Sequence, residues 1–240
     1  MKVFKLAFKG EMAIPTIALL FASGVSVALV AAKIVLARKL FFGFLVWNLF
    51  LAWVPLVFAL LACDQYRQAS RSTGRFIALS AAWLLFFPNA PYIFTDLIHL
   101  TGPAHRHYWV DMMLILACAV TGLVIGFVSL YLMQGLVRRR FGWFAGWLFS
   151  AVVTGLSGFG IYLGRILRLN SWDVVLRPLK LFRGVGHWIA NPWAQPTSPA
   201  FPVVFATFLF IAYVMLYALT HLRVPEPVPS GASRDLWPDS

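Results

Sequence analysis

The chain has 240 residues, of which 61% are hydrophobic and only 12% are charged, and its mean hydropathy is +0.81. A soluble domain is about half apolar and about a quarter charged, so this composition excludes an ordinary soluble protein. The net charge of +12 would suggest nucleic-acid binding in a soluble chain. Here the basic residues lie between apolar runs, where they orient a membrane protein and meet anionic headgroups. We therefore expect membrane lipids, anionic ones included, as partners, and no nucleic acid.

Apolar runs of about 20 residues recur along the chain, and each is long enough to cross a ~30 Å hydrocarbon core as a helix. They predict an all-α, polytopic transmembrane bundle of about six spans. The spans are expected near residues 13–36, 40–62, 76–100, 109–137, 141–167 and 201–222. We expect residues 1–224 to form a single transmembrane domain and the Pro/Ser-rich residues 225–240 to be a disordered tail. The first run is too long for the core of a signal peptide, so we expect it to be retained as a helix.

The third run is interrupted by the sequence PNAP, residues 88–91. Pro88 and Pro91 each lack a backbone N–H and disfavour helix in the residue before them, so we predict that the third helix is broken at Pro88–Pro91. The uninterrupted part, from Phe76 to Phe87, reaches only about 18 Å, which is too short to cross. A broken helix at membrane depth needs protein or a water-filled cavity to satisfy the freed backbone, and Asn89 can cap part of it. Interruptions of this kind often mark binding sites in transporters.

The fifth run carries a stripe of small residues at successive i+4 steps: Gly142, Gly146, Ser150, Thr154 and Gly158. Small residues let helix backbones approach closely in a membrane. We expect this stripe to be a packing face, with Gly122 and Gly126 of the fourth run as its counterpart. A membrane-protein partner or a second copy of the chain could also pack on it.

Polar side chains gather where the third, fourth and fifth runs reach one face of the membrane. A central Asp or Arg costs about 2.5–3.5 kcal/mol in a membrane helix, so these residues require an explanation. The third run ends and the fourth begins at one loop, and the fifth run returns to that side because the fourth and fifth both cross. We predict a ligand-binding site there, made of Asn89, Tyr92, Asp96, His99, Asp111, Arg165, Arg168, Asn170 and Asp173.

The residue types in this set suggest an anion site. Arg165 and Arg168 are spaced i,i+3, and guanidinium groups suit bidentate contact with phosphate or carboxylate. Asp96 and His99 are also spaced i,i+3 and could share a helical face, so they are the candidates for acid–base roles if there is chemistry. The alternative is that the acids simply pair with the arginines and close the bundle. No hydrolase, zinc-protease or nucleotide-binding motif accompanies the set, so the question of an enzyme stays open.

The sequence contains no strong metal-binding or cofactor-binding pattern. The histidines and Asp111 match no strong metal-binding spacing, so we predict no metal and no cofactor. Cys63 and Cys118 lie in or at the end of apolar runs and are expected to be small apolar packing residues.

The basic residues favour an orientation with both termini in the cytoplasm. Three clusters lie on one side under that arrangement, at residues 2–9, 67–75 and 138–140. The predicted ligand site then faces the extracytoplasmic side of the membrane.

Three segments resemble a known family: WNLFLAWVP (residues 47–55), FFPNAPYIFTDLIHL (residues 86–100) and GIYLGRILRLNSWDV (residues 160–174). They are similar to the bacterial membrane-protein family catalogued as domain of unknown function 1361, from the second span through the fifth or sixth. The resemblance implies a multi-pass bacterial membrane protein and singles out most of the polar residues above. It implies no catalytic roles, because the family has no assigned activity. We expect the protein in the inner membrane.

The leading hypothesis is recognition of an anionic ligand, either a lipid headgroup or a lipid-linked envelope precursor. The alternatives are a small transporter that uses the broken third helix and a structural or accessory subunit of a membrane complex.

Overall fold

The computed structural model describes residues 6–8, 10–38, 40–67, 73–101, 108–165 and 200–222, together with Leu179 and Gly186. Six helical segments within these ranges are long and apolar enough to cross a membrane, and no strand occurs in them. The predicted all-α bundle of six spans is confirmed. The predicted tail, residues 225–240, lies outside the described residues.

The first two spans form a hairpin. Helix α2 (Ala13–Ala37) follows a short 3₁₀ helix, η1 (Gly10–Met12), and helix α3 (Gly43–Arg67) follows a second one, η2 (Leu40–Phe42). Arg38 at the end of α2 adopts a left-handed conformation with φ of 51°. This conformation ends a helix, so the chain reverses within a few residues.

The third span is broken, as the two prolines predict. It consists of α4 (Thr73–Phe86), the single turn α5 (Asn89–Tyr92) and the 3₁₀ helix η3 (Ile93–Thr101). At the break, Nδ2 of Asn89 donates to the carbonyl of Phe86 at 3.1 Å. The expected cap by Asn89 is therefore present, and it satisfies one of the carbonyls that the break frees.

The fourth and fifth spans are α6 (Tyr108–Phe141) and α7 (Trp143–Arg165), and the chain reverses between them at Gly142. Gly142 has φ of +93°, a conformation that glycine adopts without strain. The predicted fifth span starts at Phe141, and its predicted stripe includes Gly142. Phe141 instead ends α6 and Gly142 is the turn, so the part of the stripe that lies in α7 begins at Gly146.

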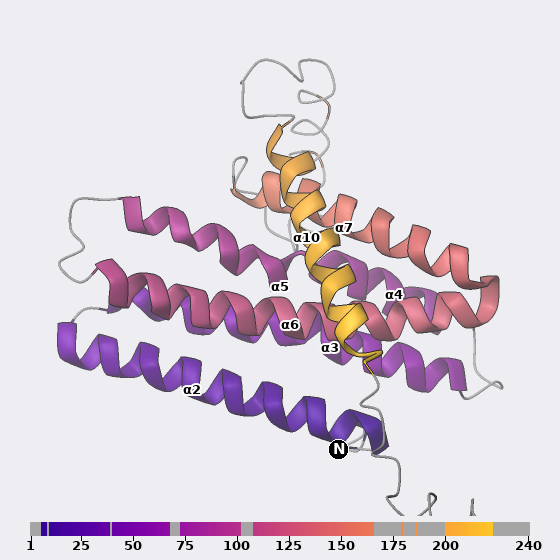
Figure 1. Ribbon diagram of the computed structural model, residues 1–240, viewed down its shortest axis with the longest axis horizontal. Coiled ribbons are helices and arrows are strands. Elements are labelled where there is room, and N and C mark those ends of the chain that lie inside the picture. The colour runs from indigo at the N-terminus through magenta and orange to yellow at the C-terminus, as the bar shows by residue number, and fades with distance from the viewer. Residues whose placement is uncertain are drawn as a thin grey trace, which may run out of the picture.

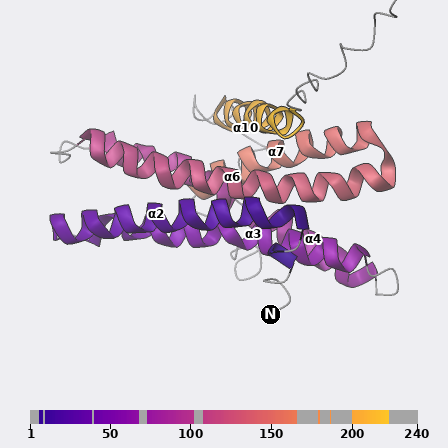
Figure 2. The ribbon, with the colours of Figure 1, turned by 60° about the horizontal axis from the view of Figure 1, so that its bottom comes forward.

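Helix α6 lies at the centre of the bundle. It packs against α2, α3, α5, η3 and α7, whereas the last span, α10 (Ala200–Leu219), packs mainly on α7. Figure 1 shows α2, α3 and α6 running along the long axis of the molecule, with α10 crossing them at an angle. Turned by 60°, the molecule shows α2, α3 and α4 on one side and α6, α7 and α10 on the other (Figure 2). The most buried span is α6, so the groups that pack on it hold the bundle together.

Two glycines of α6 receive the broken third span. A Cβ atom on Gly126 would lie 2.8 Å from Cβ of Ala90, and one on Gly122 would lie 2.8 Å from Cδ1 of Ile93. Both distances are too short for real atoms, so the glycines permit α5 and η3 to approach the α6 backbone. The prediction that Gly122 and Gly126 pack on the stripe of the fifth span was wrong.

The stripe on α7 packs against other parts of the chain. Gly146 faces the side chain of Arg138 on α6, and Gly158 faces the backbone of Pro202 on α10. Ser150 and Thr154 are buried between them. The stripe is thus occupied by contacts within the chain, and the idea that a partner or a second copy packs on it stays a prediction.

Candidate functional site at the end of the fifth span

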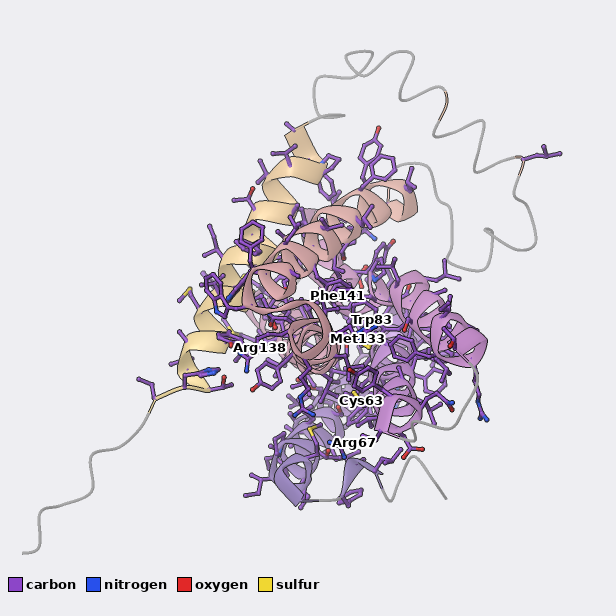
Figure 3. All side chains as sticks on the ribbon, turned by 90° about the vertical axis from the view of Figure 1, so that its right-hand side faces the viewer. Cys63, Arg67, Trp83, Met133, Arg138 and Phe141 are labelled. Carbon is purple, nitrogen blue, oxygen red and sulfur yellow. The ribbon has the colours of Figure 1, made fainter. Side chains whose placement is uncertain are left out.

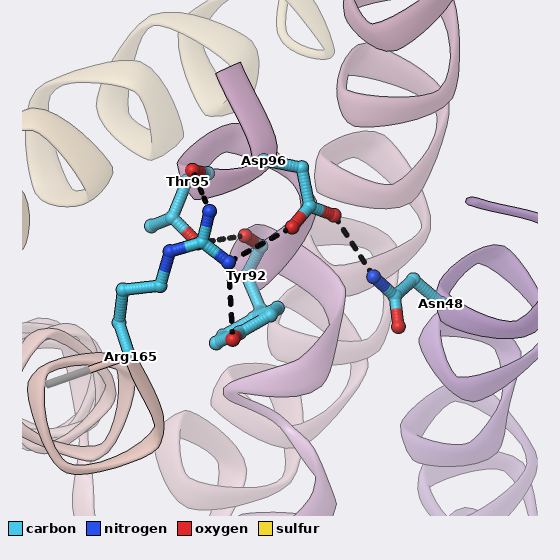
Figure 4. A network of polar contacts seen from close by, with 5 residues as sticks. All are labelled: Asn48, Tyr92, Thr95, Asp96 and Arg165. Carbon is cyan, nitrogen blue, oxygen red and sulfur yellow. Dashed lines mark hydrogen bonds and ion pairs between the residues drawn. The ribbon is translucent and has the colours of Figure 1, made fainter. Parts of the chain in front are cut away.

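Arg165, the last residue of α7, reaches across to the broken third span. Its Nη1 donates to Oδ1 of Asp96 at 3.2 Å, and its Nη2 donates to the backbone carbonyl of Thr95 at 2.7 Å. Figure 4 shows the guanidinium between these two acceptors. Contacts to a carboxylate and a carbonyl on the same short helix fix both the position and the plane of the guanidinium group.

Tyr92 completes the contact from α5. Nη1 of Arg165 also lies 3.4 Å from the Tyr92 hydroxyl, and the guanidinium carbon is 5.7 Å from the centre of the Tyr92 ring. A cation over an aromatic face is attracted to it, more strongly when water is excluded. Tyr92 belongs to the single turn that follows the prolines, so the break in the third span places this ring beside Arg165.

Asn48 of α3 holds the other oxygen of Asp96. Its Nδ2 donates to Oδ2 at 2.8 Å, while Arg165 holds Oδ1. Asp96 is only 1% exposed, and a buried carboxylate is costly unless it is paired and hydrogen-bonded. The network therefore ties α3, η3 and α7 together through one carboxylate (Figure 4).

A second ion pair lies toward the same end of the bundle. Nζ of Lys33, near the end of α2, is 2.6 Å from Oδ1 of Asp111 in the first turn of α6. The Lys33 ammonium also lies 5.9 Å from the centre of the Phe42 ring. Because α2 and α7 run toward this end and α6 begins there, both ion pairs belong to one end of the molecule.

The two ion pairs are alike in how deeply their members are buried. The side chain of Arg165 is 15% exposed and that of Asp96 is 2% exposed, while the values for Lys33 and Asp111 are 16% and 5%. In each pair the carboxylate is the deeper group and the cation is the more accessible one.

The structure brings together three of the predicted site residues, namely Tyr92, Asp96 and Arg165. Asn89 caps the break through its bond to the Phe86 carbonyl, and Asp111 belongs to the second pair. Arg168, Asn170 and Asp173 lie outside the described residues, and so does the side chain of His99. The ligand-binding roles of all nine residues stay predictions.

Of the ion pairs expected under the alternative, the one between Asp96 and Arg165 is present in the structure. Two participants were missed by the sequence analysis, Asn48 and Lys33. The available signal was the same for both, since each is a polar side chain inside an apolar run and must find a partner. Asn48 even lies within the first of the three segments that resemble the family.

The network holds one guanidinium group in a fixed position. Both oxygens of Asp96 accept hydrogen bonds from the protein, so its role in this arrangement is to position Arg165. Within the described part of the chain, no three His, Cys, Asp or Glu side chains gather closely enough to hold a metal ion. A guanidinium group binds anions, and phosphate and carboxylate are the groups that fit its planar donors.

The chain matches one known protein family. The model of the family described as "Protein of unknown function (DUF1361)" matches residues 47–215, which is more than half of the chain. The chain belongs to this family. No curated protein and no solved structure matches it. The family region of this DUF1361 protein contains Asn48, Asp96, Asp111 and Arg165, whereas Lys33 precedes it. With its six apolar helices, this member of the family is a multi-pass membrane protein.

Proposed function

We propose that this DUF1361 protein binds an anionic ligand at the end of the bundle where Arg165 and Lys33 lie. The ligand is a phosphate-bearing group, supplied either by a lipid headgroup or by a lipid-linked envelope precursor. The observation that supports the proposal is common to the two ion pairs: the carboxylate is buried and the cation is the less buried group.

The contacts of Arg165 support this role. Its Nη1 and Nη2 atoms hold Asp96, Tyr92 and Thr95, and its Nε has no hydrogen-bond partner among the residues that the structure describes. The guanidinium is therefore fixed in orientation and still has donor capacity. A fixed donor binds a ligand more tightly than a mobile one, because less side-chain entropy is lost on binding.

The location that we propose is the bacterial inner membrane, with both termini in the cytoplasm. Arg67 and residues 138–140 lie at the ends of α3 and α6, away from the Arg165 network. Basic residues near span ends favour the cytoplasmic side. The proposed ligand site then faces the extracytoplasmic side, where lipid-linked envelope precursors are used.

The test is native mass spectrometry of the purified protein in micelles doped with phosphatidylglycerol, a polyprenyl phosphate or phosphatidylcholine. We expect adducts with one of the two anionic lipids and one bound lipid fewer per protein in Arg165→Gln. Which anionic lipid binds distinguishes the headgroup from the precursor. Arg140→Gln, an exposed arginine at the opposite end, is the control for net charge. Unchanged binding by Arg165→Gln would rule the proposal out.

Arg165→Gln also leaves the Asp96 carboxylate without its cation, so a second variant separates binding from folding. The double substitution Asp96→Asn with Arg165→Gln replaces the ion pair by two neutral amides. We expect this variant to keep a folded bundle, as judged by its thermal unfolding, and still to lack the anionic adduct. A folded double variant that binds like the unmodified protein would contradict the proposal.

Transport is the second candidate function, because the third span is broken and Asn89 at the break is only half-buried. An aqueous path would expose Asn89→Cys to thiol reagents from both sides of the membrane, in a background with Cys63→Ala and Cys118→Ala. The close packing of α5 on Gly126 argues for a sealed break. Labelling from both sides would support transport, and the absence of labelling would support a packing role.

A further inference from the structure

A cavity of about 460 Å³ lies at the opposite end of the bundle, remote from the Arg165 network. It opens where α3, α6 and α10 end and where the short helix η1 leads into α2. Figure 3 looks onto this end of the molecule and labels Cys63, Arg67 and Arg138, all of which line the cavity. The volume is in the range of small-molecule sites.

The charged groups of the cavity wall are mainly cations. Arg67, Arg138 and Arg139 line it, and Asp64 is the one carboxylate among the described lining residues. Basic residues at span ends are common in membrane proteins, since they orient the chain. That tendency does not require them to converge on a hollow. Arg140, the next residue along the chain, does not line the cavity, so a substitution there is a control for the same substitution at Arg139.

One of the arginines is held in place at the wall. Nη1 of Arg138 donates to the Tyr217 hydroxyl of α10 at 2.8 Å. Tyr217 is itself packed edge-to-face against Trp147, with ring centres 4.9 Å apart. A long cationic side chain at a span end usually extends into solvent. Arg138 is exposed as well, but a residue from another helix holds it beside the cavity.

A buried amide supplies a further polar group. Gln134 lines the cavity and is only 2% exposed. Its carbonyl oxygen accepts a hydrogen bond from Tyr213, and its amide nitrogen has no acceptor among the described residues. This nitrogen is a hydrogen-bond donor on a residue that lines the cavity, so it can donate to an acceptor inside the cavity.

The rest of the wall is apolar. Met12, Leu60, Leu132 and Leu136 contribute to it. A soluble phosphate compound would gain little from these side chains. An amphiphile would match both parts, with its phosphate at the arginines and its hydrocarbon against the leucines.

We infer that this cavity binds the phosphate headgroup of an anionic membrane lipid, in the leaflet that contacts the ends of α3 and α6. Arg67, Arg138 and Arg139 hold the phosphate, and Gln134 donates a hydrogen bond to a headgroup oxygen. This site is separate from the one proposed at Arg165 and shares no residue with it.

The test compares two neighbouring arginines. Arg139→Gln and Arg140→Gln remove the same charge from the same helix end, but only Arg139 lines the cavity. The probe is phosphatidic acid in phosphatidylcholine-containing micelles, with lipid adducts counted by native mass spectrometry. All variants carry Arg165→Gln, so that the site proposed at Arg165 does not contribute adducts. We expect at least a fivefold loss of phosphatidic acid adducts in Arg139→Gln and less than a twofold change in Arg140→Gln. Equal losses would show attraction by surface charge and would overturn the inference.

Filling the cavity is an independent test that leaves all charges in place. Gly135 lines the cavity, and a Cβ atom there would have no neighbour within 4 Å. Gly135→Leu should therefore fold and occupy the space, with a loss of adducts like that of Arg139→Gln. Unchanged adducts in Gly135→Leu would overturn the inference. So would full displacement of the lipid by equimolar glycerol 3-phosphate, because a soluble phosphate would then be the better ligand.

Discussion

Arg165 and Asp96 lie 69 residues apart in the sequence and form an ion pair, with Nη1 and Oδ1 separated by 3.2 Å. The pair joins the end of α7 to the 3₁₀ helix that completes the broken third span. Either charged side chain, if buried here without the other, would have a large desolvation penalty. The pair thus explains why a span interrupted by two prolines keeps a defined position in the bundle.

Removing the carboxylate of Asp96 should destabilise the bundle strongly. Asp96→Ala leaves Arg165 without its anion and Asn48 without its acceptor, and breaking a buried pair in this way costs about 3–5 kcal/mol. The loss is measured as a fall in the free energy of unfolding, by titration with sodium dodecyl sulfate in mixed micelles.

A double-mutant cycle provides the control for this prediction. If the pair acts as a unit, Asp96→Asn combined with Arg165→Gln should cost less than the sum of the two single changes. Strictly additive losses would show that the two residues stabilise the bundle independently, against the contact described here.

The stability of the bundle should depend more on the charge of residue 48 than on its size. Asn48→Leu removes one hydrogen bond to Asp96, which is worth about 1–2 kcal/mol between helices in a membrane. Asn48→Asp keeps the shape but places a second carboxylate beside the first, and like charges at this distance repel. We expect Asn48→Asp to lower the thermal unfolding temperature more than Asn48→Leu does. The reverse order would mean that Asn48 acts by packing.

The fold followed from the sequence because its two main signals are local. Apolar runs mark the spans, and the residues Pro88 and Pro91 mark the break, so the six helices and the interruption were found without knowledge of their contacts. The Gly142 turn was misplaced because a glycine in a turn and a glycine in a helical stripe have the same spacing. Only the φ of +93° separates them.

Two residues of the site, Asp96 and Arg165, were predicted from the sequence, but the residues Asn48 and Lys33, which bond to the site's carboxylates, were not. The requirement that polar groups in a membrane be paired selected Asp96 and Arg165, and their common side followed from counting crossings. The requirement does not say which helix supplies each partner. Lys33 and Asn48 come from the first two spans, and only the packing of α2 and α3 on α6 brings them to Asp111 and Asp96.

Gly126 should tolerate no side chain. Gly126→Ala would place a Cβ atom 2.8 Å from Cβ of Ala90, and such overpacking typically costs about 1–3 kcal/mol. Gly155→Ala in α7 is the matched control, since a Cβ atom there meets open space. In a helix, alanine is favoured over glycine by up to about 1 kcal/mol. We expect Gly126→Ala to lower the unfolding temperature and Gly155→Ala to leave it unchanged or raise it.

The stripe on α7 should act as a packing face within the chain. Ser150 is fully buried, its hydroxyl donates to the carbonyl of Gly146 in its own helix, and it also contacts the Tyr213 hydroxyl of α10, so a larger side chain would not fit there. Ser150→Leu should push α7 away from the helices it packs on, with a loss of about 1–3 kcal/mol in the free energy of unfolding. Val152→Leu makes the same new side chain on the outer face, where residue 152 is 51% exposed, and should have little effect. Equal stability of the two variants in a detergent titration would show that the stripe is not a packing face. A stable Ser150→Leu variant that loses a co-purifying protein would show instead that a partner occupies it.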